Sequence, residues 1–253
     1  FGPFSGGFKT AEYCSSNCDC SKVCELSINS IESLITENTC AVLVEPIQGE
    51  GGIVTPRSGW LKQLREVCTQ NNVLLILDEI QSGLGRTGKL FAYEHENIQP
   101  DGLILGKALG GGLLPVSAFL SSREVMDHFN PGSHGSTFGG NPLVTSAALG
   151  VLDVFQNTNV LENVNKMSEY FRSEFDNKIK NNIAVKELRI KGLMIGIGLD
   201  SNIIDCSQLV KKALKDNLLI NVTGTSIRML PPLIITEEEI DILISKLIKL
   251  IST

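Results

Sequence analysis

The chain has 253 residues, of which 42% are hydrophobic and 20% are charged. This composition excludes a disordered or collagen-like chain and is sufficient for one large domain or two smaller ones. The formal net charge of −6 argues against a nucleic-acid partner and against an anionic membrane surface, because both would require clusters of basic residues. No apolar run is long enough to cross a bilayer.

The first residues, FGPF, are typical of a loop, and we expect that a further segment precedes Phe1. No signal-peptide pattern opens the chain, so we expect a soluble protein of the cytoplasm. The mitochondrial matrix is the alternative, because a targeting peptide would lie upstream of Phe1.

Cysteines are concentrated in one short segment, which contains Cys14, Cys18, Cys20 and Cys24. Their spacing lacks the paired CxxC knuckles of common zinc sites. We therefore expect reduced thiols in a surface insertion near residues 10–25, and we keep metal binding and a redox switch as alternatives.

Short apolar runs alternate with helical patterns from Cys40 onward, which predicts an α/β fold with a mostly parallel sheet. The predicted strands cover residues 40–44, 73–77, 102–105 and 116–120, and a helix begins at Trp60. The branched apolar run at 73–77 is typical of a strand covered on both faces. Asn141-Pro142 predicts the start of a helix over 142–155, which is apolar on nearly all sides and is therefore expected to be buried.

The pattern changes to a smaller α+β arrangement after Gln156, and we place a domain boundary near residue 157. Residues 1–156 are predicted to belong to the large domain, and residues 157–253 to a small C-terminal domain. The small domain is predicted to contain a long helix over 161–179, a strand over 193–199 and a short helix over 207–214. Thr236 and Glu239 form a capping box that predicts the start of the final helix.

Two charged residues follow predicted strands, at the sheet edge where ligands bind in parallel sheets: Asp78 and Lys107. A lysine desolvated behind a buried strand is suited to Schiff-base chemistry with a carbonyl cofactor. Asp78 could hold the ring nitrogen of pyridoxal phosphate protonated, and Ser136 and Thr137 in a glycine-rich loop could donate to its phosphate. A lysine that reaches solvent and a simple turn are the alternatives.

Four motifs occur in succession: VEPIQGEGG at 44–52, LDEIQSGLGRTG at 77–88, GKALGGG at 106–112 and HGSTFGGNP at 134–142. In order and spacing they resemble the signatures of the class III pyridoxal-phosphate aminotransferases. The resemblance runs from Cys40 to the end and is poor between Thr10 and Glu25. It implies a fold-type I architecture, pyridoxal 5'-phosphate as cofactor, and a homodimer with shared active sites.

The resemblance also implies roles for individual residues. Lys107 would bind the cofactor covalently and transfer a proton as general acid and base, and Asp78 would hold the cofactor ring charged. Gln81 would hydrogen-bond the phenolic oxygen of the ring. Ser136 and Thr137 would bind phosphate, and Thr137 would reach the cofactor of the neighbouring subunit.

Within this class, the segments FGPF at 1–4, LPVSA at 114–118 and PPL at 231–233 resemble the members that act on ornithine. The implied reaction transfers the δ-amino group of L-ornithine to 2-oxoglutarate and gives glutamate semialdehyde and glutamate. Glu50 and Arg228 are expected to bind substrate by pairing for ornithine and separating for 2-oxoglutarate.

Other functions are compatible with the same sequence. Gly51 stands where members acting on ornithine often carry Ala, which keeps N-acetylornithine or another ω-amino acid as alternative donors. The remaining alternatives are an aminomutase and a non-catalytic fragment with a cysteine-based redox or metal function.

Overall fold

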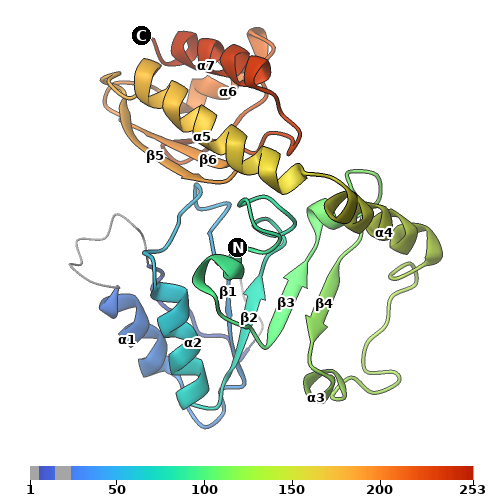
Figure 1. Cartoon of the computed structure of the whole chain (residues 1–253). Coiled ribbons are helices and arrows are strands. Elements are labelled where there is room, and N and C mark those ends of the chain that lie inside the picture. Colours follow the sequence, from blue (N-terminus) through green and yellow to red (C-terminus); the bar gives the residue numbers. More distant parts are fainter. Residues whose placement is uncertain (1–5, 15–23, 253) are drawn as a thin grey trace.

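The computed structural model describes residues 6–14 and 24–252 and contains two four-stranded sheets. The first unit is formed by α1 (Glu25–Leu34), β1 (Ala41–Val44), α2 (Trp60–Gln70), β2 (Leu74–Asp78), η1 (Ala92–Glu96), β3 (Gly102–Leu105), η2 (Lys107–Gly110), β4 (Ala118–Ser121), α3 (Arg123–Met126) and α4 (Pro142–Asn157). The second is formed by α5 (Val160–Lys178), β5 (Val185–Lys191), β6 (Met194–Leu199), η3 (Cys206–Gln208), α6 (Leu209–Lys215), β7 (Asn221–Thr223), β8 (Ser226–Met229) and α7 (Glu237–Ile251). In Figure 1 the second unit lies above the first.

The first sheet has the order β1-β2-β3-β4, with β1, β2 and β3 parallel. The predicted α/β fold with a mostly parallel sheet is therefore confirmed. Residues 116–120, predicted as another strand of the same kind, contribute to β4, which runs antiparallel to β3. The direction reverses because the connection from β3 contains only the short turn η2 and no crossover helix.

Helices α1 and α2 cover one face of this sheet. Trp60 is fully buried beneath them, and its Nε1 donates a hydrogen bond to Oγ of Ser27 at 3.1 Å. Leu75 and Leu77 of β2 face the same core, whereas the alternate residues of the strand are only half-buried. The prediction that both faces are covered is wrong for the part of the chain that the structure describes, because α1 and α2 pack on one face alone.

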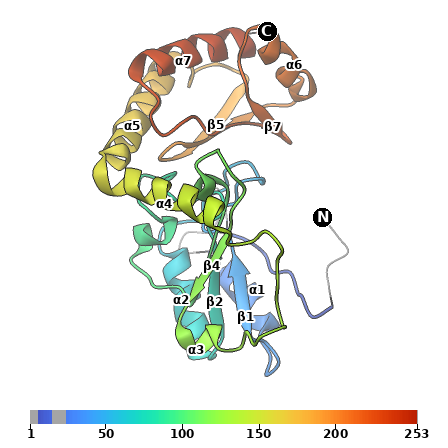
Figure 2. The same ribbon diagram turned by 90° about the vertical axis from the view of Figure 1, so that its right-hand side faces the viewer.

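Helix α4 begins as predicted: Oδ1 of Asn141 caps it by accepting from the amides of Leu143 (3.0 Å) and Val144 (3.2 Å). The expectation that the helix is buried is wrong, since Val144 is its only buried residue. Figure 2 shows α4 lying across the first unit beside its sheet, so most of its apolar surface is exposed.

The second sheet is antiparallel throughout and has the order β5-β6-β8-β7. Helices α5 and α7 pack on one face through Phe171, Phe175 and Leu247. The capping box predicted at Thr236 and Glu239 is present and begins α7. On the opposite face, β6 presents glycines, and this is the side on which the first unit approaches.

The two units are joined through residues 86–88. Nη1 of Arg86 donates to the carbonyl oxygen of Pro231 at 2.5 Å, and the amide of Leu193 donates to the carbonyl oxygen of Arg86 at 2.9 Å. A Cβ at Gly192 would lie 2.4 Å from the carbonyl carbon of Thr87, so only glycine fits at this contact. The domain boundary proposed near residue 157 lies between α4 and α5 and stays a prediction.

The cysteine segment is described only at its two ends. Cys18 and Cys20, with the redox and metal alternatives that involve them, lie outside the described residues. Cys14 and Cys24 are buried in the core that contains Trp60, so the expectation of a surface insertion is wrong at these two residues. Within residues 6–14 and 24–252, no helix is long and apolar enough to cross a membrane.

Candidate active site

The carboxyl ends of the parallel strands bring three ionisable residues to one edge of the sheet. Glu45 follows β1, Asp78 is the last residue of β2, and Lys107 follows β3 after a single glycine. Val44 pairs with Leu77, so Glu45 and Asp78 leave adjacent strands side by side. Ligands bind at this edge in open α/β sheets, which makes the cluster the first candidate site.

Lys107 is the first residue of η2 and has a φ of 41°, in the left-handed region that non-glycine residues seldom adopt. Strained backbone of this kind is concentrated at functional sites. The residue is exposed. The expectation that its ammonium is desolvated is therefore wrong in this structure, because the sheet edge is open beside it.

Glu45 was assigned no role from the sequence. Its Oε2 accepts a hydrogen bond from the amide of Gly49 at 3.0 Å. Burial raises the pKa of the Glu45 carboxyl, the negative charge of Asp78 raises it further, and the positive charge of Lys107 opposes both. Its position directly after a strand, in the first motif, was the available signal.

Asp78 and Gln81 lie in the second motif. Oδ1 of Asp78 accepts from the amide of Ile80 at 3.0 Å. Gln81 donates from Nε2 to Oε1 of Glu50 at 3.1 Å, while its own Oε1 is buried with no hydrogen-bond partner among the described residues. The Gln81 amide packs so closely on Gly49 that a Cβ there would lie 1.8 Å from the Gln81 oxygen.

Glu50 and Arg228 form an ion pair, with Oε1 and Nη1 2.6 Å apart. The Arg228 side chain is 7% exposed and that of Glu50 is 63% exposed, so the guanidinium is fixed and the carboxylate is accessible. Arg228, followed by Gln81, lowers the pKa of Glu50. Arg228 stands on an interior strand, because β8 lies between β6 and β7.

Ser136 and Thr137 lie apart from this cluster, in the exposed loop before α4. Oγ of Ser136 accepts from the amide of Gly139 at 2.9 Å within the same loop. Among the described residues, no hydrogen bond or ion pair joins the loop to the strand ends. The structure therefore brings together Asp78, Gln81, Lys107, Glu50 and Arg228 and leaves the two hydroxyl residues outside.

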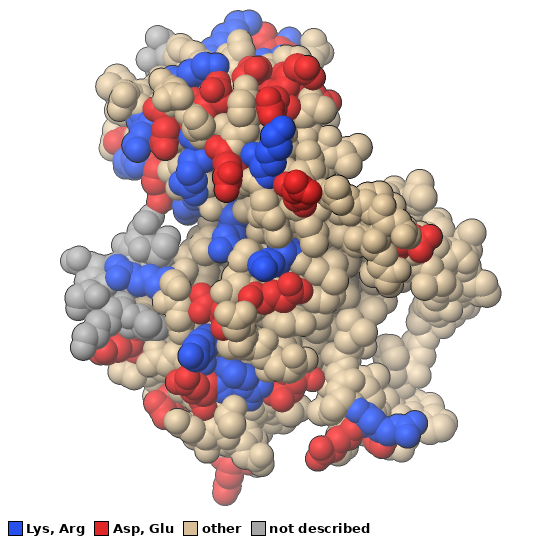
Figure 3. Space-filling view, in the orientation of Figure 1, with Lys and Arg blue, Asp and Glu red and all other residues tan. Residues whose placement is uncertain are grey.

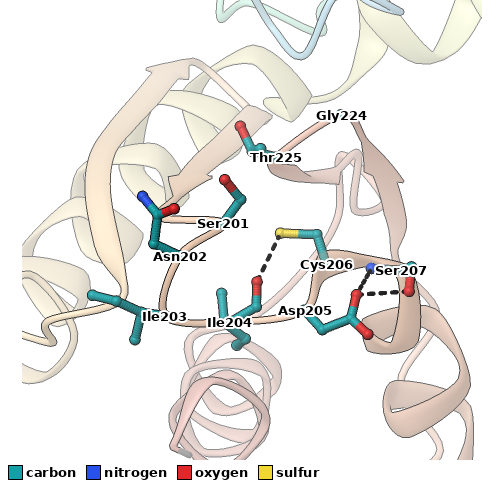
Figure 4. Close-up of a pocket in the computed structure, with 9 residues that line it drawn as sticks. All are labelled: Ser201, Asn202, Ile203, Ile204, Asp205, Cys206, Ser207, Gly224 and Thr225. Atoms are coloured by element: carbon teal, nitrogen blue, oxygen red, sulfur yellow. Dashed lines mark hydrogen bonds between the residues drawn. The ribbon is translucent and has the colours of Figure 1, made fainter.

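A separate hollow lies in the second unit, lined by residues 201–207 together with Gly224 and Thr225 (Figure 4). Asp205 turns back on its own segment, where its Oδ1 accepts from the amide of Ser207 at 2.9 Å. Cys206 donates from Sγ to the carbonyl oxygen of Ile204 at 3.8 Å. The hollow contains none of the residues predicted from the sequence, and the strand-end cluster remains the candidate active site.

The chain belongs to the class III aminotransferase family, whose model matches residues 1–251. Among its relatives is the ornithine aminotransferase of Macrococcus caseolyticus, which is 47% identical over 97% of this chain and 58% of that protein. Ornithine aminotransferase 2 of Staphylococcus aureus is 44% identical over similar shares of the two chains. This chain therefore spans little more than half the length of these curated relatives.

Solved structures give the same family. The ornithine aminotransferase of Toxoplasma gondii has a TM-score of 0.89 and 38% identity, over 99% of this chain and 57% of that one. The acetylornithine aminotransferase of Elizabethkingia anophelis has a TM-score of 0.81 and 43% identity, over 88% of this chain and 57% of that one. The fold is therefore the fold-type I architecture of these enzymes, whereas the neighbours differ in their named substrates.

Proposed function

We propose that the protein containing this chain is a pyridoxal-phosphate aminotransferase that transfers the δ-amino group of L-ornithine to 2-oxoglutarate, giving glutamate semialdehyde and glutamate. The observation that carries the proposal is the 2.6 Å ion pair between Glu50 and Arg228. The positive charge of Lys107 also acts on the Glu50 carboxylate and lowers its pKa. Family membership and the relatives named ornithine aminotransferase support the same reaction.

The strand-end residues suit pyridoxal phosphate, which the Toxoplasma gondii relative holds at partial occupancy in its active site. When bound, this cofactor withdraws electrons from the substrate carbon that loses a proton. Asp78 uses one lone pair for the Ile80 amide and retains others for the protonated ring nitrogen. The buried, unpartnered Oε1 of Gln81 is an acceptor to which a phenolic O–H of the cofactor could donate.

Lys107 supplies a primary amine at the open edge of the sheet, where it would hold the cofactor covalently. Lys107 would also act as general base and general acid on the substrate, because its amine can remove a proton from the substrate carbon and give a proton back. Ser136 and Thr137 would donate hydrogen bonds to the phosphate, with Thr137 acting on the cofactor of the neighbouring subunit.

Glu50 and Arg228 would let one site accept two different substrates. In the paired state Glu50 neutralises Arg228 and hides it from the α-carboxylate of ornithine. When 2-oxoglutarate binds, the exposed Glu50 carboxylate would swing away and Arg228 would hold a substrate carboxylate through two hydrogen bonds. The buried arginine stays in place because β8 is an interior strand.

The test is the visible spectrum of the complete protein with pyridoxal phosphate, before and after addition of L-ornithine. We expect a yellow band that disappears with ornithine and is absent in Lys107→Ala. Glu50→Gln should keep the band and react faster with glutamate as donor, because its Arg228 is no longer neutralised. A band that ornithine leaves unchanged would refute the proposed donor.

N-acetylornithine is the second candidate donor, favoured by the likeness to the Elizabethkingia anophelis enzyme and by Gly51. Rates of the first half-reaction with ornithine, N-acetylornithine and another ω-amino acid would separate the candidates. The proposal requires ornithine to react fastest per unit concentration. A faster reaction with N-acetylornithine would assign the chain to that activity instead.

We also propose that the protein is a homodimer with shared active sites. Leu143 and Leu149 of α4 are 67% and 66% exposed, and Phe138 in the preceding loop is 79% exposed. In Figure 3 the surface over α4 is almost free of charged residues, in contrast to the small domain above it. A surface with few charges and with exposed leucine and phenylalanine side chains, beside the loop that carries Thr137, suits a contact with a second copy.

The proposed compartment is the cytoplasm, and the mitochondrial matrix is the alternative. Subcellular fractionation of the natural protein, with enzymes of both compartments as markers, distinguishes the two. Co-purification with the matrix markers would overturn the cytoplasmic assignment.

A further inference from the structure

Glu50 is carried by a narrow hairpin, residues 48–54. Gln48 and Val54 exchange two backbone hydrogen bonds of 3.0 and 2.9 Å, and the amides of Gly52 and Ile53 both donate to the carbonyl oxygen of Gly49. These bonds tie the two arms of the hairpin together. The hairpin therefore moves as one piece, and the contacts that hold it in place also fix the position of the Glu50 backbone.

The hairpin rests on the sheet of the small domain. A Cβ at Gly196 of β6 would lie 2.7 Å from the carbonyl oxygen of Gly52, so the two backbones are in direct contact. Ile53 is fully buried in a small cluster with Ile47 and Met194, although its φ of 60° is unusual for a β-branched residue. Packing against the second unit thus keeps Ile53, and with it the hairpin, in a backbone conformation that a β-branched residue does not favour.

Arg189 lies beside this contact. It pairs in register with Gly196, which pairs in register with Arg228 on the other side, so the two arginines share one face of the sheet. The Arg189 side chain is 14% exposed. Its Nη2 donates a hydrogen bond to Oγ of Ser226, and a Cβ at Gly52 would lie 3.4 Å from the same nitrogen.

We infer that Arg189 is a positioning residue that sets the resting place of the 48–54 hairpin and thereby the pairing of Glu50 with Arg228. Its guanidinium packs under Gly52, held by Ser226 and by an ion pair with Glu187 at 3.6 Å. This inference rests on the proposed function, because it concerns the selectivity of that same site.

Loss of Arg189 should therefore change selectivity rather than activity in general. A loosened hairpin leaves Arg228 without its carboxylate for more of the time, which favours substrates with two carboxylates. We expect Arg189→Met to lower the preference for ornithine over glutamate as donor about tenfold in kcat/KM. Arg189→Lys, which keeps the positive charge, should retain part of the preference for ornithine. Gly196→Ala should lower this preference as Arg189→Met does, because the added methyl group would displace Gly52.

The experiment uses the complete enzyme with bound cofactor and measures the half-reactions with ornithine and with glutamate separately. Arg172→Met, an exposed arginine on α5, is the matched control and should behave like the unmodified enzyme. Equal losses with both donors, or no change in their ratio, would overturn the inference. Equal losses would mean that Arg189 only stabilises the fold. Denaturant unfolding measures the stability of each variant.

A binding measurement separates this inference from the proposed reaction. Glutarate, a dicarboxylate without an amine, should bind more tightly to Arg189→Met than to the unmodified enzyme, and more tightly still to Glu50→Gln. This readout does not require ornithine to be a substrate. Unchanged glutarate affinity in Arg189→Met would refute the inference, whereas an unmodified enzyme that does not react with ornithine would refute the proposed function.

Discussion

Gly49 and Gly51 lie two positions apart in the hairpin, but an added methyl group meets different surroundings at each. At Gly49 it would lie 1.8 Å from Oε1 of Gln81, and at Gly51 its nearest neighbour would be Oε1 of Gln48 at 3.3 Å. Gln81 can move aside because its amide ends a flexible side chain. We predict that Gly49→Ala weakens pyridoxal-phosphate binding about tenfold, because it displaces Gln81.

Gly51→Ala is the matched control and should bind the cofactor as the unmodified enzyme does. Spectroscopic titration of the cofactor-free protein measures both dissociation constants. Urea unfolding should give nearly equal stabilities, within about 0.5 kcal/mol, because neither change removes core packing. Unaltered cofactor affinity in Gly49→Ala would contradict the role proposed for Gln81.

Glu79, next to Asp78, is a buried carboxyl whose protonation affects the stability of the fold. Its side chain is buried and accepts hydrogen bonds from the amides of Ala92 (2.6 Å) and Tyr93 (2.9 Å). Burial outweighs these bonds and raises the pKa of the carboxyl from 4.5 to about 7. The folded protein thus holds this proton more tightly than the unfolded chain, so the contribution to stability is greatest below pH 4.5 and is lost as the pH rises to 7.

We predict that this loss reaches at most about 3 kcal/mol in the free energy of unfolding between pH 4.5 and 7. Glu79→Gln should be less stable at acid pH, because the NH2 group that replaces one carboxyl oxygen cannot accept the hydrogen bond made there, and should lack this part of the pH dependence. Urea titrations at a series of pH values provide the comparison, with the exposed Glu124→Gln as control. Identical slopes in Glu79→Gln and the unmodified protein would contradict the assignment.

At the scale of elements, the capping box at the start of α7 can be tested directly. Oγ1 of Thr236 accepts from the amide of Glu239 at 3.3 Å, and Oε2 of Glu239 accepts from the amide of Thr236 at 2.9 Å. Thr236→Ala should lower the free energy of unfolding by about 1 kcal/mol, because one helix amide loses its acceptor. Glu238→Gln, in the same turn but outside the capping box, should change it less, and an equal loss would contradict the cap.

Local signals of this kind explain which elements could be predicted from the sequence. The α2 and α7 helices and the β2 strand follow from periodicity and caps within a few residues of each element. The exposure of α4 and the direction of β4 could not be predicted in this way, because they depend on what packs against an element and how it is connected. An apolar composition shows that a helix can be buried, but whether it is buried depends on which elements pack against it.

The same distinction holds for the candidate site. Asp78, Lys107 and Glu50 stand in recognisable motifs, so the sequence points to them directly. Glu45 directly follows a strand within the first motif, and this signal was overlooked. Arg189 has no such signal, because its place beside the site arises from register: it shares a row with Arg228 through Gly196. A neighbour of this kind becomes visible only when the strands are paired.

At the scale of the whole molecule, the two units meet at the ion pair proposed to select the substrate, since Glu50 belongs to the first unit and Arg228 to the second. Arg86 fixes this arrangement by donating to Pro231 across the contact, and burial there lowers its pKa to about 10, which leaves it charged at neutral pH. This contact places Glu50 and Arg228 within reach of each other, and of the two side chains the Glu50 carboxylate is the exposed one.

The exposed loop with Thr137 and the apolar α4 surface require a test at the level of the dimer. Thr137 has no link to Lys107 within the described chain, which is expected if it serves the cofactor of the neighbouring subunit. We predict that Lys107→Ala and Thr137→Ala complement each other when co-expressed. In a mixed dimer, one site would contain both defects, and the other would combine an intact Lys107 with the intact Thr137 of the partner.

Random assembly of the two variants would make half of the dimers mixed, so about a quarter of all sites would regain full activity. Co-expression with distinguishable tags and purification of the mixed dimer raise that fraction to about half. If Thr137 instead binds the cofactor of its own subunit, no site in the mixed dimer combines the two intact residues, and activity stays at the level of the variants alone. Leu149→Asp, placed on the exposed face of α4, should abolish complementation by separating the subunits. Ile183→Asp, also exposed but on the second unit, should leave it intact.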